Sequence, residues 1–391
     1  MTRRRPVLCL LALGLASASL PPGTAGAAGA TGPDPGVELE ETAAIPSLLL
    51  DNAVTAADLT GDGADELIVL SDNGVAQRYD VDTGFRWSVS TIEIADRLGI
   101  RPFEYTSRFE ADYRGLFQCT TDHGVAFIER TGDDVLDVVA TTWLRLGEGS
   151  DVEQRSYVVE LDGENGAILA LHRFEGHVTN LLPAGGSDLF VVEEDGPVDQ
   201  AEVGSSVVER GTGGTTRIHR YDLEQARSVW THDTDRSWGR ASAVTVGSLD
   251  GQGDDVALAL ASSATKPVGG SVSCAGEPDV EPAANDLIAL DGATGNPLWS
   301  SPAPKTVREL LTTRNEAEGG EAVVVLARGA VGSSVRSVDG ATGETRWTAA
   351  LPSGAVAWDL EPHGGRIAAA YATPGPAAAA GDLSRLALID A

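Results

Sequence analysis

The sequence predicts an all-β protein that folds as a β-propeller, a ring of four-stranded antiparallel sheets called blades. Three observations lead to this prediction. Apolar segments repeatedly flank glycine- or acid-rich turns, the pattern recurs six times along the chain, and most units end in a second shared turn. Because one four-stranded sheet cannot bury both of its faces, repeats of roughly 45 to 70 residues are typical of blades that pack against one another.

Each unit opens with two predicted strands joined by a short turn. The first unit shows the pattern, with NAVTAADL followed by TGD and GADELIVL. The second predicted strands of the six units cover residues 63–70, 134–141, 185–192, 253–260, 319–326 and 364–371. Alternating apolar residues on both sides of glycine and aspartate favour an antiparallel pair.

Five units then share a second stretch, for which LDGATGNPLW is representative. The copies cover residues 79–87, 161–169, 221–230, 290–299 and 338–347. Thr-Gly or Asn-Gly between apolar runs favours a tight hairpin, which completes a four-stranded meander. Four copies end in tryptophan, at Trp87, Trp230, Trp299 and Trp347. Recurrence at one repeat position indicates packing between blades rather than stacking on a cofactor.

The sixth unit stops at residues 386–391, where its last strand should begin. An unpaired edge strand invites pairing with other chains. We therefore expect residues 36–45 to supply the missing strand, so that N- and C-terminal strands share one blade and close the ring. Six blades are expected. Seven remain open, because residues 91–117 fit either a helical insertion or part of a further blade.

Two stretches depart from the repeat inside the third and fourth units. Residues 192–217 and 261–286 are rich in glycine, serine and proline, with scattered acidic residues. This composition is typical of mobile surface loops. We expect both stretches to be excursions from their blades.

The N-terminus has the order of a secretory signal peptide. Three arginines precede an apolar run from Val7 to Leu20, and small residues follow it. The run is shorter than the ~20 residues that a transmembrane helix needs. We expect residues 1–27 to be a signal peptide cleaved near Ala27, residues 28–35 to be a disordered mature N-terminus, and residues 36–391 to be one propeller domain. The protein is expected to be secreted, either extracellular or associated with the envelope.

Charge and cysteine content narrow the classes of partner. The formal net charge of −30 disfavours nucleic acid and anionic lipid. We expect no nucleic-acid binding, no membrane insertion and a monomer. The mature chain would keep Cys119 and Cys274, which are candidates for a disulfide in an oxidising compartment; two buried free thiols are the alternative.

Two of the quoted patterns resemble known propeller repeats. LDGATGNPLW and VDGATGETRW resemble the repeat of PQQ-like β-propellers. The stretch DLTGDGADELIVL, residues 58–70, resembles the calcium-loop repeat called FG-GAP or VCBS, found in integrin-type propellers. The resemblance covers about residues 45–391. It implies the fold strongly and the function weakly, because propellers host many unrelated tasks.

The first of these turns has the spacing of a calcium loop. Oxygen donors stand at positions 1, 3 and 5, a glycine stands at position 6, and a carbonyl and a carboxylate follow. The predicted ligands are Asp58, Thr60, Asp62, Ala64 through its carbonyl, and Glu66. The alternative is a solvated acidic turn. Every unit keeps the turn, but only one or two units keep the carboxylates, which indicates structural rather than catalytic calcium.

No stretch of the sequence matches a known arrangement of catalytic residues. The PQQ-like resemblance suggests a quinone-dependent oxidoreductase, but the sequence lacks the pair of adjacent cysteines found in the alcohol-oxidising class of these enzymes. None of the six histidines stands in an H-x-x-x-H or G-x-S-x-G context. Trp143 and Trp238 lie outside the repeat position of the other tryptophans, and Arg236 accompanies Trp238 in a loop between blades. These three residues are the candidates for a ligand-facing surface, with ordinary loop packing as the alternative.

Together these observations favour an exported, non-catalytic propeller that serves as a protein-interaction scaffold, with structural calcium in one blade. The partner would be an unidentified protein or an envelope glycan. A calcium-dependent, lectin-like propeller is the first alternative. A PQQ-dependent oxidoreductase is the more remote alternative.

Overall fold

The structure is a computed structural model, and its described residues belong to one compact unit, Leu49–Ala391. They are residues 52–71, 74–100, 105–109, 124–146, 153–194, 198–203, 206–211, 215–237, 241–261, 285–303, 306–314, 321–329, 332–363, 366–372 and 385–390. The expected signal peptide, the disordered segment and the closing strand at residues 36–45 lie outside them.

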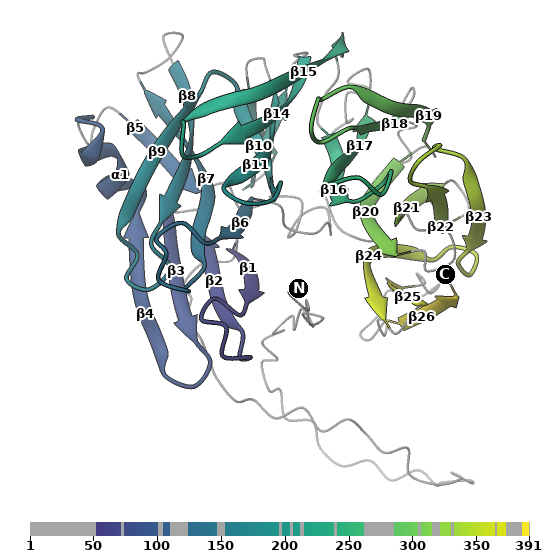
Figure 1. The fold of residues 1–391 in the computed structure, drawn as a ribbon, viewed down its shortest axis with the longest axis horizontal. Helices are drawn as coiled ribbons and strands as arrows, with labels where there is room; N and C mark the ends of the chain where they lie inside the picture. The colour runs from purple at the N-terminus through teal and green to yellow at the C-terminus, as the bar shows by residue number, and fades with distance from the viewer. Residues whose placement is uncertain are drawn as a thin grey trace, which may run out of the picture. The chain divides into compact units, whose positions relative to one another are not determined.

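The first three blades are consecutive antiparallel sheets (Figure 1). Blade 1 contains β1 (Asn52–Ala57), β2 (Glu66–Ser71), β3 (Val75–Asp80) and β4 (Gly84–Ser90). Blade 2 contains β5 (Tyr105–Phe109), β6 (Val125–Ile128), β7 (Asp137–Leu146), β8 (Glu153–Leu161) and β9 (Ile168–Phe174). Blade 3 contains β10 (His177–Pro183), β11 (Asp188–Glu194), β14 (Thr215–Asp222) and β15 (Arg227–Ser237).

Three further sheets follow in the same order. Blade 4 contains β16 (Ala241–Gly247), β17 (Asp255–Ala261), β18 (Asn285–Leu290) and β19 (Pro297–Pro302). Blade 5 contains β20 (Thr306–Arg314), β21 (Glu321–Gly329), β22 (Gly332–Asp339) and β23 (Thr345–Ala350). Blade 6 shows three described strands, β24 (Val356–His363), β25 (Arg366–Ala372) and β26 (Arg385–Asp390). The predicted meander is thereby confirmed, since neighbouring strands pair antiparallel in chain order.

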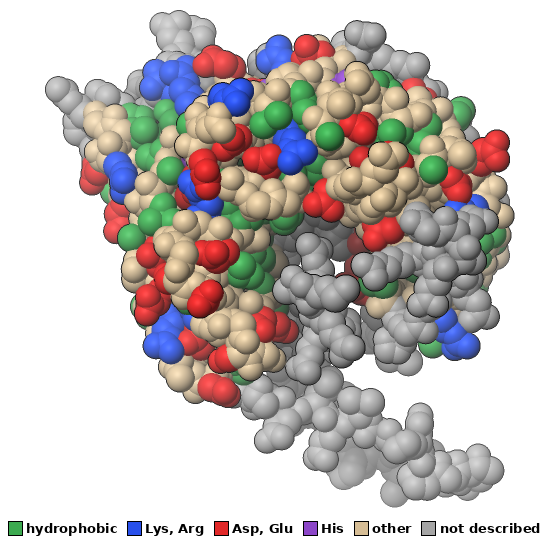
Figure 2. All heavy atoms as spheres, in the orientation of Figure 1, with side chains coloured by type: hydrophobic (Ala, Val, Ile, Leu, Met, Phe, Trp, Pro, Cys, Tyr) green, Lys and Arg blue, Asp and Glu red, His purple; other side chains and the backbone are tan. Residues whose placement is uncertain are grey.

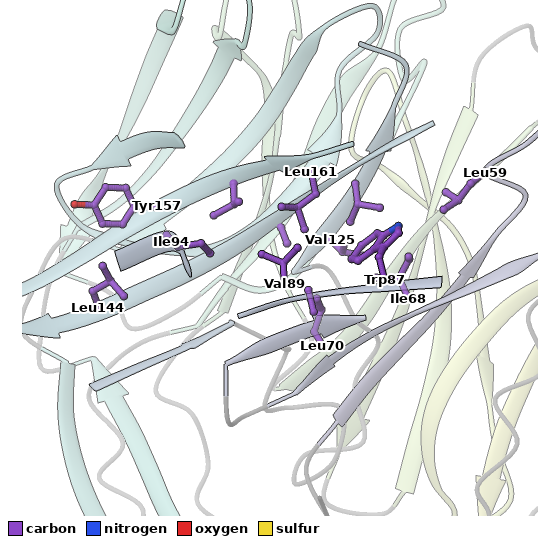
Figure 3. Packing of buried hydrophobic residues seen from close by; sticks show 14 residues of the cluster. Leu59, Ile68, Leu70, Trp87, Val89, Ile94, Val125, Leu144, Tyr157 and Leu161 are labelled. Carbon is purple, nitrogen blue, oxygen red and sulfur yellow. The ribbon is translucent and has the colours of Figure 1, made fainter. Parts of the chain in front are cut away.

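The core lies between the sheets. In the described part of the chain, five clusters of buried apolar side chains each join one blade to the next, from blades 1 and 2 through to blades 5 and 6. Figure 3 shows the first cluster, in which Ile68 and Val89 of blade 1 meet Leu161 of blade 2. Strands buried on both faces explain why the second strand of each unit is a nearly continuous apolar run.

Residues 91–117 do not form a further blade in their described parts. Helix α1 (Thr91–Arg97) begins directly after β4, where Ser90 and Glu93 form a reciprocal capping box. Strand β5 then pairs with β7, beyond the part of β7 that pairs with β6. The helical alternative is therefore correct, and the rest of the described stretch extends the sheet of blade 2.

The first of the two predicted surface excursions contains regular structure. Strands β12 (Val198–Val203) and β13 (Ser206–Gly211) pair as a two-stranded hairpin between β11 and β14. The stretch at residues 192–217 is thus an excursion from the sheet of blade 3, as expected, and its described part forms a small sheet of its own. Residues 262–284, most of the second excursion, lie outside the described part.

Candidate functional site: the acidic turn of blade 1

The predicted calcium loop joins β1 to β2, and its backbone depends on two glycines. Gly61 and Gly63 have φ angles of 72° and 90°, which favour residues without a Cβ atom. Asp58 Oδ2 accepts a hydrogen bond from the Gly63 N–H at 3.0 Å. Asp62 Oδ1 accepts one from the Ala64 N–H at 2.8 Å. The two carboxylates therefore hold the turn through its own backbone.

Asp58 also has an oxygen with unused bonding capacity. Its Oδ1 atom is buried and accepts no hydrogen bond from the described residues. A carboxylate oxygen removed from water without a donor is costly. A bound cation would satisfy this atom, so the donor at the first position of the predicted loop fits calcium.

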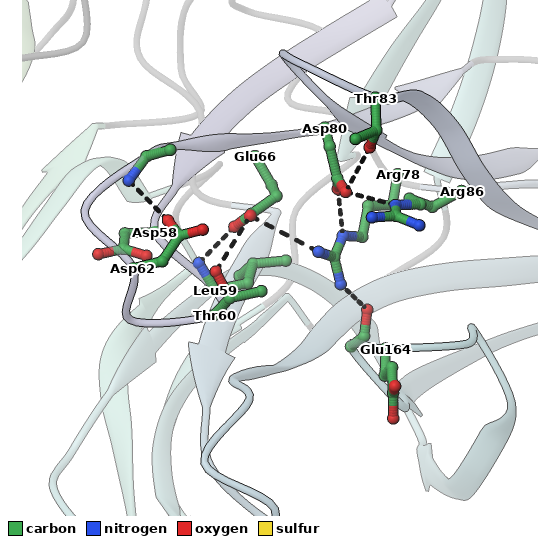
Figure 4. Close-up of polar contacts among 12 residues, drawn as sticks. Asp58, Leu59, Thr60, Asp62, Glu66, Arg78, Asp80, Thr83, Arg86 and Glu164 are labelled. Carbon is green, nitrogen blue, oxygen red and sulfur yellow. Dashed lines mark hydrogen bonds and ion pairs between the residues drawn. The ribbon is translucent and has the colours of Figure 1, made fainter.

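Glu66, the last predicted ligand, points toward different partners (Figure 4). Its carboxylate accepts a 2.7 Å hydrogen bond from the Leu59 N–H and a 3.4 Å bond from Thr60 Oγ1. Arg78 lies 3.6 Å away as an ion-pair partner. Burial raises the pKa of the Glu66 carboxyl, and the Leu59 N–H and Arg78 only partly oppose this effect. Glu66 thus holds the start of the turn to β2 and β3.

Arg78 extends this network to blade 2 (Figure 4). Its Nε donates to Asp80 Oδ1 at 3.0 Å, and its Nη1 donates to the carbonyl of Gly163 at 2.6 Å. Asp80 is also paired with Arg86, and these contacts lower the pKa of Asp80 despite its burial. The acidic turn is therefore the end of a charged network that crosses from one blade to the next.

The structure thus places the five predicted calcium ligands on one turn but divides their roles. Asp58, Thr60 and Asp62 lie along the loop, whereas Glu66 is engaged behind it. Across the described residues, no group of three or more histidine, cysteine, aspartate or glutamate side chains is arranged to hold a metal ion. Calcium binding stays a prediction, with Asp58 as the ligand that the geometry favours most.

The acid that ends the turn has the same role in other blades. Asp137 Oδ2 accepts hydrogen bonds from the backbone of Arg130 and Thr131, while its Oδ1 accepts one from the Gly163 N–H at 3.0 Å. Asp255 repeats this arrangement in blade 4, with Oδ1 bound to the Gly292 N–H at 3.0 Å. Burial raises the pKa of both carboxyls. In blades 2 and 4 this position therefore joins the two turns of the blade, and calcium binding by Glu66 stays a prediction.

The repeat tryptophans contact the following blade, as predicted. The indole N–H groups of Trp87, Trp230 and Trp299 donate to carbonyls of the next blade at 2.9, 2.9 and 2.5 Å. The acceptors are the first turn glycines, Gly163, Gly292 and Gly340. The second turn glycines lie against the indole rings, where an added Cβ would approach ring atoms within 2.6–2.7 Å. Glycine is therefore required by the tryptophan of the preceding blade.

The contact between blades 2 and 3 uses different residues. Ala170 pairs with Glu160 at the register position that tryptophan occupies in blades 1, 3 and 4. Leu223, which is buried, follows Asp222 where the hairpins of blades 2, 4 and 5 have glycine. This contact thus has a small residue at the tryptophan position and a large residue at the first glycine position. Glu160 contacts Arg130 at 2.8 Å and is paired with His172.

The remaining predicted site residues are only partly described. Trp143 lies within β7, and Arg236 lies near the end of strand β15 rather than in a loop between blades as expected. Trp238, Cys119 and Cys274 lie outside the described residues. Their assignment to a ligand surface and to a disulfide stays a prediction. No helix in the described ranges is long and apolar enough to cross a membrane.

Six consecutive sheets with repeating contacts define the chain as a β-propeller repeat protein. No family model matches it, and no curated protein matches it. Similar solved structures include the rhamnogalacturonan lyase YesW (15% identity, TM-score 0.43, 82% of this chain and 55% of that one). They also include the Dos1 propeller, with 10% identity, a TM-score of 0.43, and coverage of 79% of this chain and 64% of that one. BamB from Moraxella catarrhalis has 14% identity, a TM-score of 0.39, and coverage of 82% of this chain and 86% of that one. The chain spans about half the length of YesW, and at these identities the likeness concerns the fold alone.

Proposed function

We propose that this propeller is an exported, non-catalytic scaffold that binds another macromolecule at or outside the cell envelope. The observation that supports this proposal most is that the repeated arginine and tryptophan residues bind the neighbouring blade. Arg78 and Trp87 donate to the same carbonyl of Gly163, and Arg220 and Trp230 repeat this at Gly292. Such contacts hold successive blades rigidly, which is what a platform for binding loops requires.

We propose structural calcium in the turn of blade 1. Asp58, Thr60 and Asp62 would hold the ion, with the carbonyl of Ala64, and the buried Asp58 Oδ1 is the observation in favour. Calcium would stabilise the turn without taking part in chemistry. Glu66 would support the loop through its bond to the Leu59 N–H. This assignment follows the resemblance to FG-GAP or VCBS loops.

The surface charge suits a partner with basic contact groups. The formal net charge is −30, and acidic side chains are spread over the face shown in Figure 2. Complementary charge raises the rate of encounter and selects against acidic partners. A basic protein surface is therefore the favoured partner, and an envelope glycan recognised by Trp143 and Trp238 is the alternative that the same experiment would reveal.

Affinity capture from an envelope extract tests the proposal. The mature chain would be used as bait in calcium and in chelator, with Asp62→Ala as a matched bait, and eluates would be examined for protein and for glycan. We expect one recurrent protein whose capture weakens as salt is raised. Recovery of glycan alone, lost on changing Trp143 or Trp238, would replace the scaffold with the lectin. Quinone-dependent dye reduction by the bait would contradict the non-catalytic assignment.

A further inference from the structure

A histidine on blade 3 lies between a buried carboxylate and two hydroxyl groups. His219 is on β14, Glu193 is on β11, and Ser228 and Thr231 are on β15. The His219 Nδ1 atom is 3.0 Å from Thr231 Oγ1 and 3.2 Å from Ser228 Oγ. Its Nε2 atom is 2.8 Å from Glu193 Oε2. This is the order of a hydroxyl, a base and a group that orients the base.

The environment of Glu193 fixes which nitrogen of His219 carries the proton. Burial opposes ionisation of Glu193, but the hydrogen bonds from His219 and the Gly176 N–H outweigh it and lower the pKa of this carboxyl. An ionised carboxylate only accepts hydrogen bonds, so Nε2 must donate. In neutral His219, Nδ1 then presents its lone pair to the two hydroxyls. The imidazole is oriented to accept a proton from one of them.

Among the described residues of the array, the hydroxyl side is the more exposed. His219 and Glu193 are buried, and Phe174 of blade 2 lies against the imidazole with ring centroids 5.8 Å apart. Thr231 is exposed and Ser228 is half-buried. The residue that bears the candidate hydroxyl is therefore exposed, while the base and its carboxylate are buried.

We propose that Thr231 is an activated hydroxyl that accepts an acyl group from activated esters. Thr231 Oγ1 would form a bond to the ester carbonyl carbon while its proton passes to His219 Nδ1. The carbon–oxygen bond to the leaving alcohol would break, and the departing alkoxide would take the proton from His219. No electron transfer is involved. One acyl group per chain requires no turnover, so this modification goes beyond the binding role proposed above and is independent of it.

The same interface contains a matched pair that should not react. His172 Nε2 is paired with buried Glu160, and His172 Nδ1 is 3.2 Å from the hydroxyl of Tyr221. Tyr221 is buried, and burial raises its pKa. The histidine and carboxylate are alike in the two arrays, but here the hydroxyl is a buried phenol. His172 therefore provides the control for His219.

Reaction of the mature protein with p-nitrophenyl acetate tests the proposal. We expect a stoichiometric burst of p-nitrophenolate and a single acetyl group on the peptide that contains Thr231, located by mass spectrometry. Thr231→Val should abolish this label. His219→Gln should slow it at least about tenfold, since a positioned base typically contributes more than that, while His172→Gln should leave the rate unchanged.

Several outcomes would overturn the assignment. Label confined to Lys266, Lys305 or the N-terminal amine would show ordinary surface acylation. If the label were lost in Ser228→Ala but kept in Thr231→Val, the acyl acceptor would be Ser228 and not Thr231. Equal slowing by His172→Gln and His219→Gln would point to general loosening of the blade contact. Thermal melting of each variant separates loss of reactivity from loss of fold, and Thr231→Val is exposed and nearly isosteric.

Discussion

At the residue scale, the contacts between blades follow a rule of complementary size. Tryptophan faces glycine in three of the contacts described, whereas between blades 2 and 3 Ala170 stands at the tryptophan position and Leu223 at the first glycine position. A Cβ atom at Gly292 would lie 1.6 Å from the carbonyl oxygen of Asp254, so that position tolerates no larger residue.

This rule predicts a favourable coupling between a strand substitution and a turn substitution. Ala170→Trp should destabilise the protein because Leu223 and Ala226 stand where the tryptophan contact of other blades has glycine, and a turn variant with Leu223→Gly and Ala226→Gly should cost about 2–5 kcal/mol as a large-to-small core change. The variant that combines both changes should be more stable than the sum of the two by at least about 1 kcal/mol, since it recreates the common contact. Urea denaturation of the four proteins measures this. Strict additivity would show that the two positions do not meet.

The acidic turn of blade 1 predicts a dependence on calcium. If calcium binds Asp58 and Asp62, chelation should lower the melting temperature by about 2–5 °C, as expected for a ligand that binds only the folded state. Asp62→Ala should melt like chelated wild type in either buffer. Asp133→Ala, in the equivalent turn of blade 2, is the matched control. Identical melting of wild type in calcium and in chelator would leave the turn as a hydrogen-bonded acidic loop.

The carboxylates between blades 2 and 3 predict a dependence on pH. His172 and Arg130 overcome the burial of Glu160 and lower its pKa below the ordinary value of 4.5. A lowered folded-state pKa contributes stability above the unfolded pKa, and this stability is lost as pH falls through the folded pKa. Glu160→Gln should therefore be less stable than wild type near about pH 7, and the difference should shrink as pH falls below about 4.5.

Asp137 provides the contrast for this measurement. Burial raises its pKa, so the folded protein binds this proton more tightly than the unfolded chain, and the contribution of this group to stability falls as pH rises through the window above 3.8. As pH falls through the acidic range, the difference in melting temperature between wild type and variant should therefore change in opposite directions for Glu160→Gln and Asp137→Asn. Parallel curves would contradict the assigned pKa directions.

At the element scale, the alternating pattern predicted the strands well and their contacts less well. The segment at residues 63–70 was expected as a strand, and β2 begins at Glu66 because the preceding residues belong to the turn. The pairing of β5 with β7 could not be read from the sequence, since it joins segments separated by another strand, β6, and by a long connection. Pairings of that kind depend on tertiary packing rather than on a local pattern.

Blade 6 predicts a role for the segment before blade 1. Leu386 and Leu388 on β26 are 65% and 49% exposed, which is unusual for leucines on a strand of a packed blade. If residues 36–45 complete this blade, a chain that begins at residue 46 should melt several degrees below one that begins at residue 28. Replacing residues 28–35 alone by a glycine-serine stretch should have no effect. Equal melting of all three chains would exclude the segment as the closing strand.

At the scale of the whole molecule, the fold was predictable and the candidate sites were only partly so. Six repeats and their turns predicted six blades because each repeat carries its own hairpins. The calcium loop was found from spacing, but spacing could not show that Glu66 turns toward Leu59. The array around His219 was not found from the sequence. Glu193 and Thr231 lie on separate strands, and only the register of those strands brings them to the same imidazole.

The central claim is that the propeller acts as an exported interaction scaffold. Cross-linking in intact cells tests it most directly, with a photoreactive residue placed at exposed Glu164 in a turn of blade 2 and another at exposed Glu224 in a turn of blade 3. We predict adducts with one recurrent exported protein, recovered outside the cytoplasmic membrane and sensitive to salt. The account would be contradicted if the protein were found only in the cytoplasm. It would also be contradicted if the exported protein formed no adduct from either turn and bound no partner in the extract.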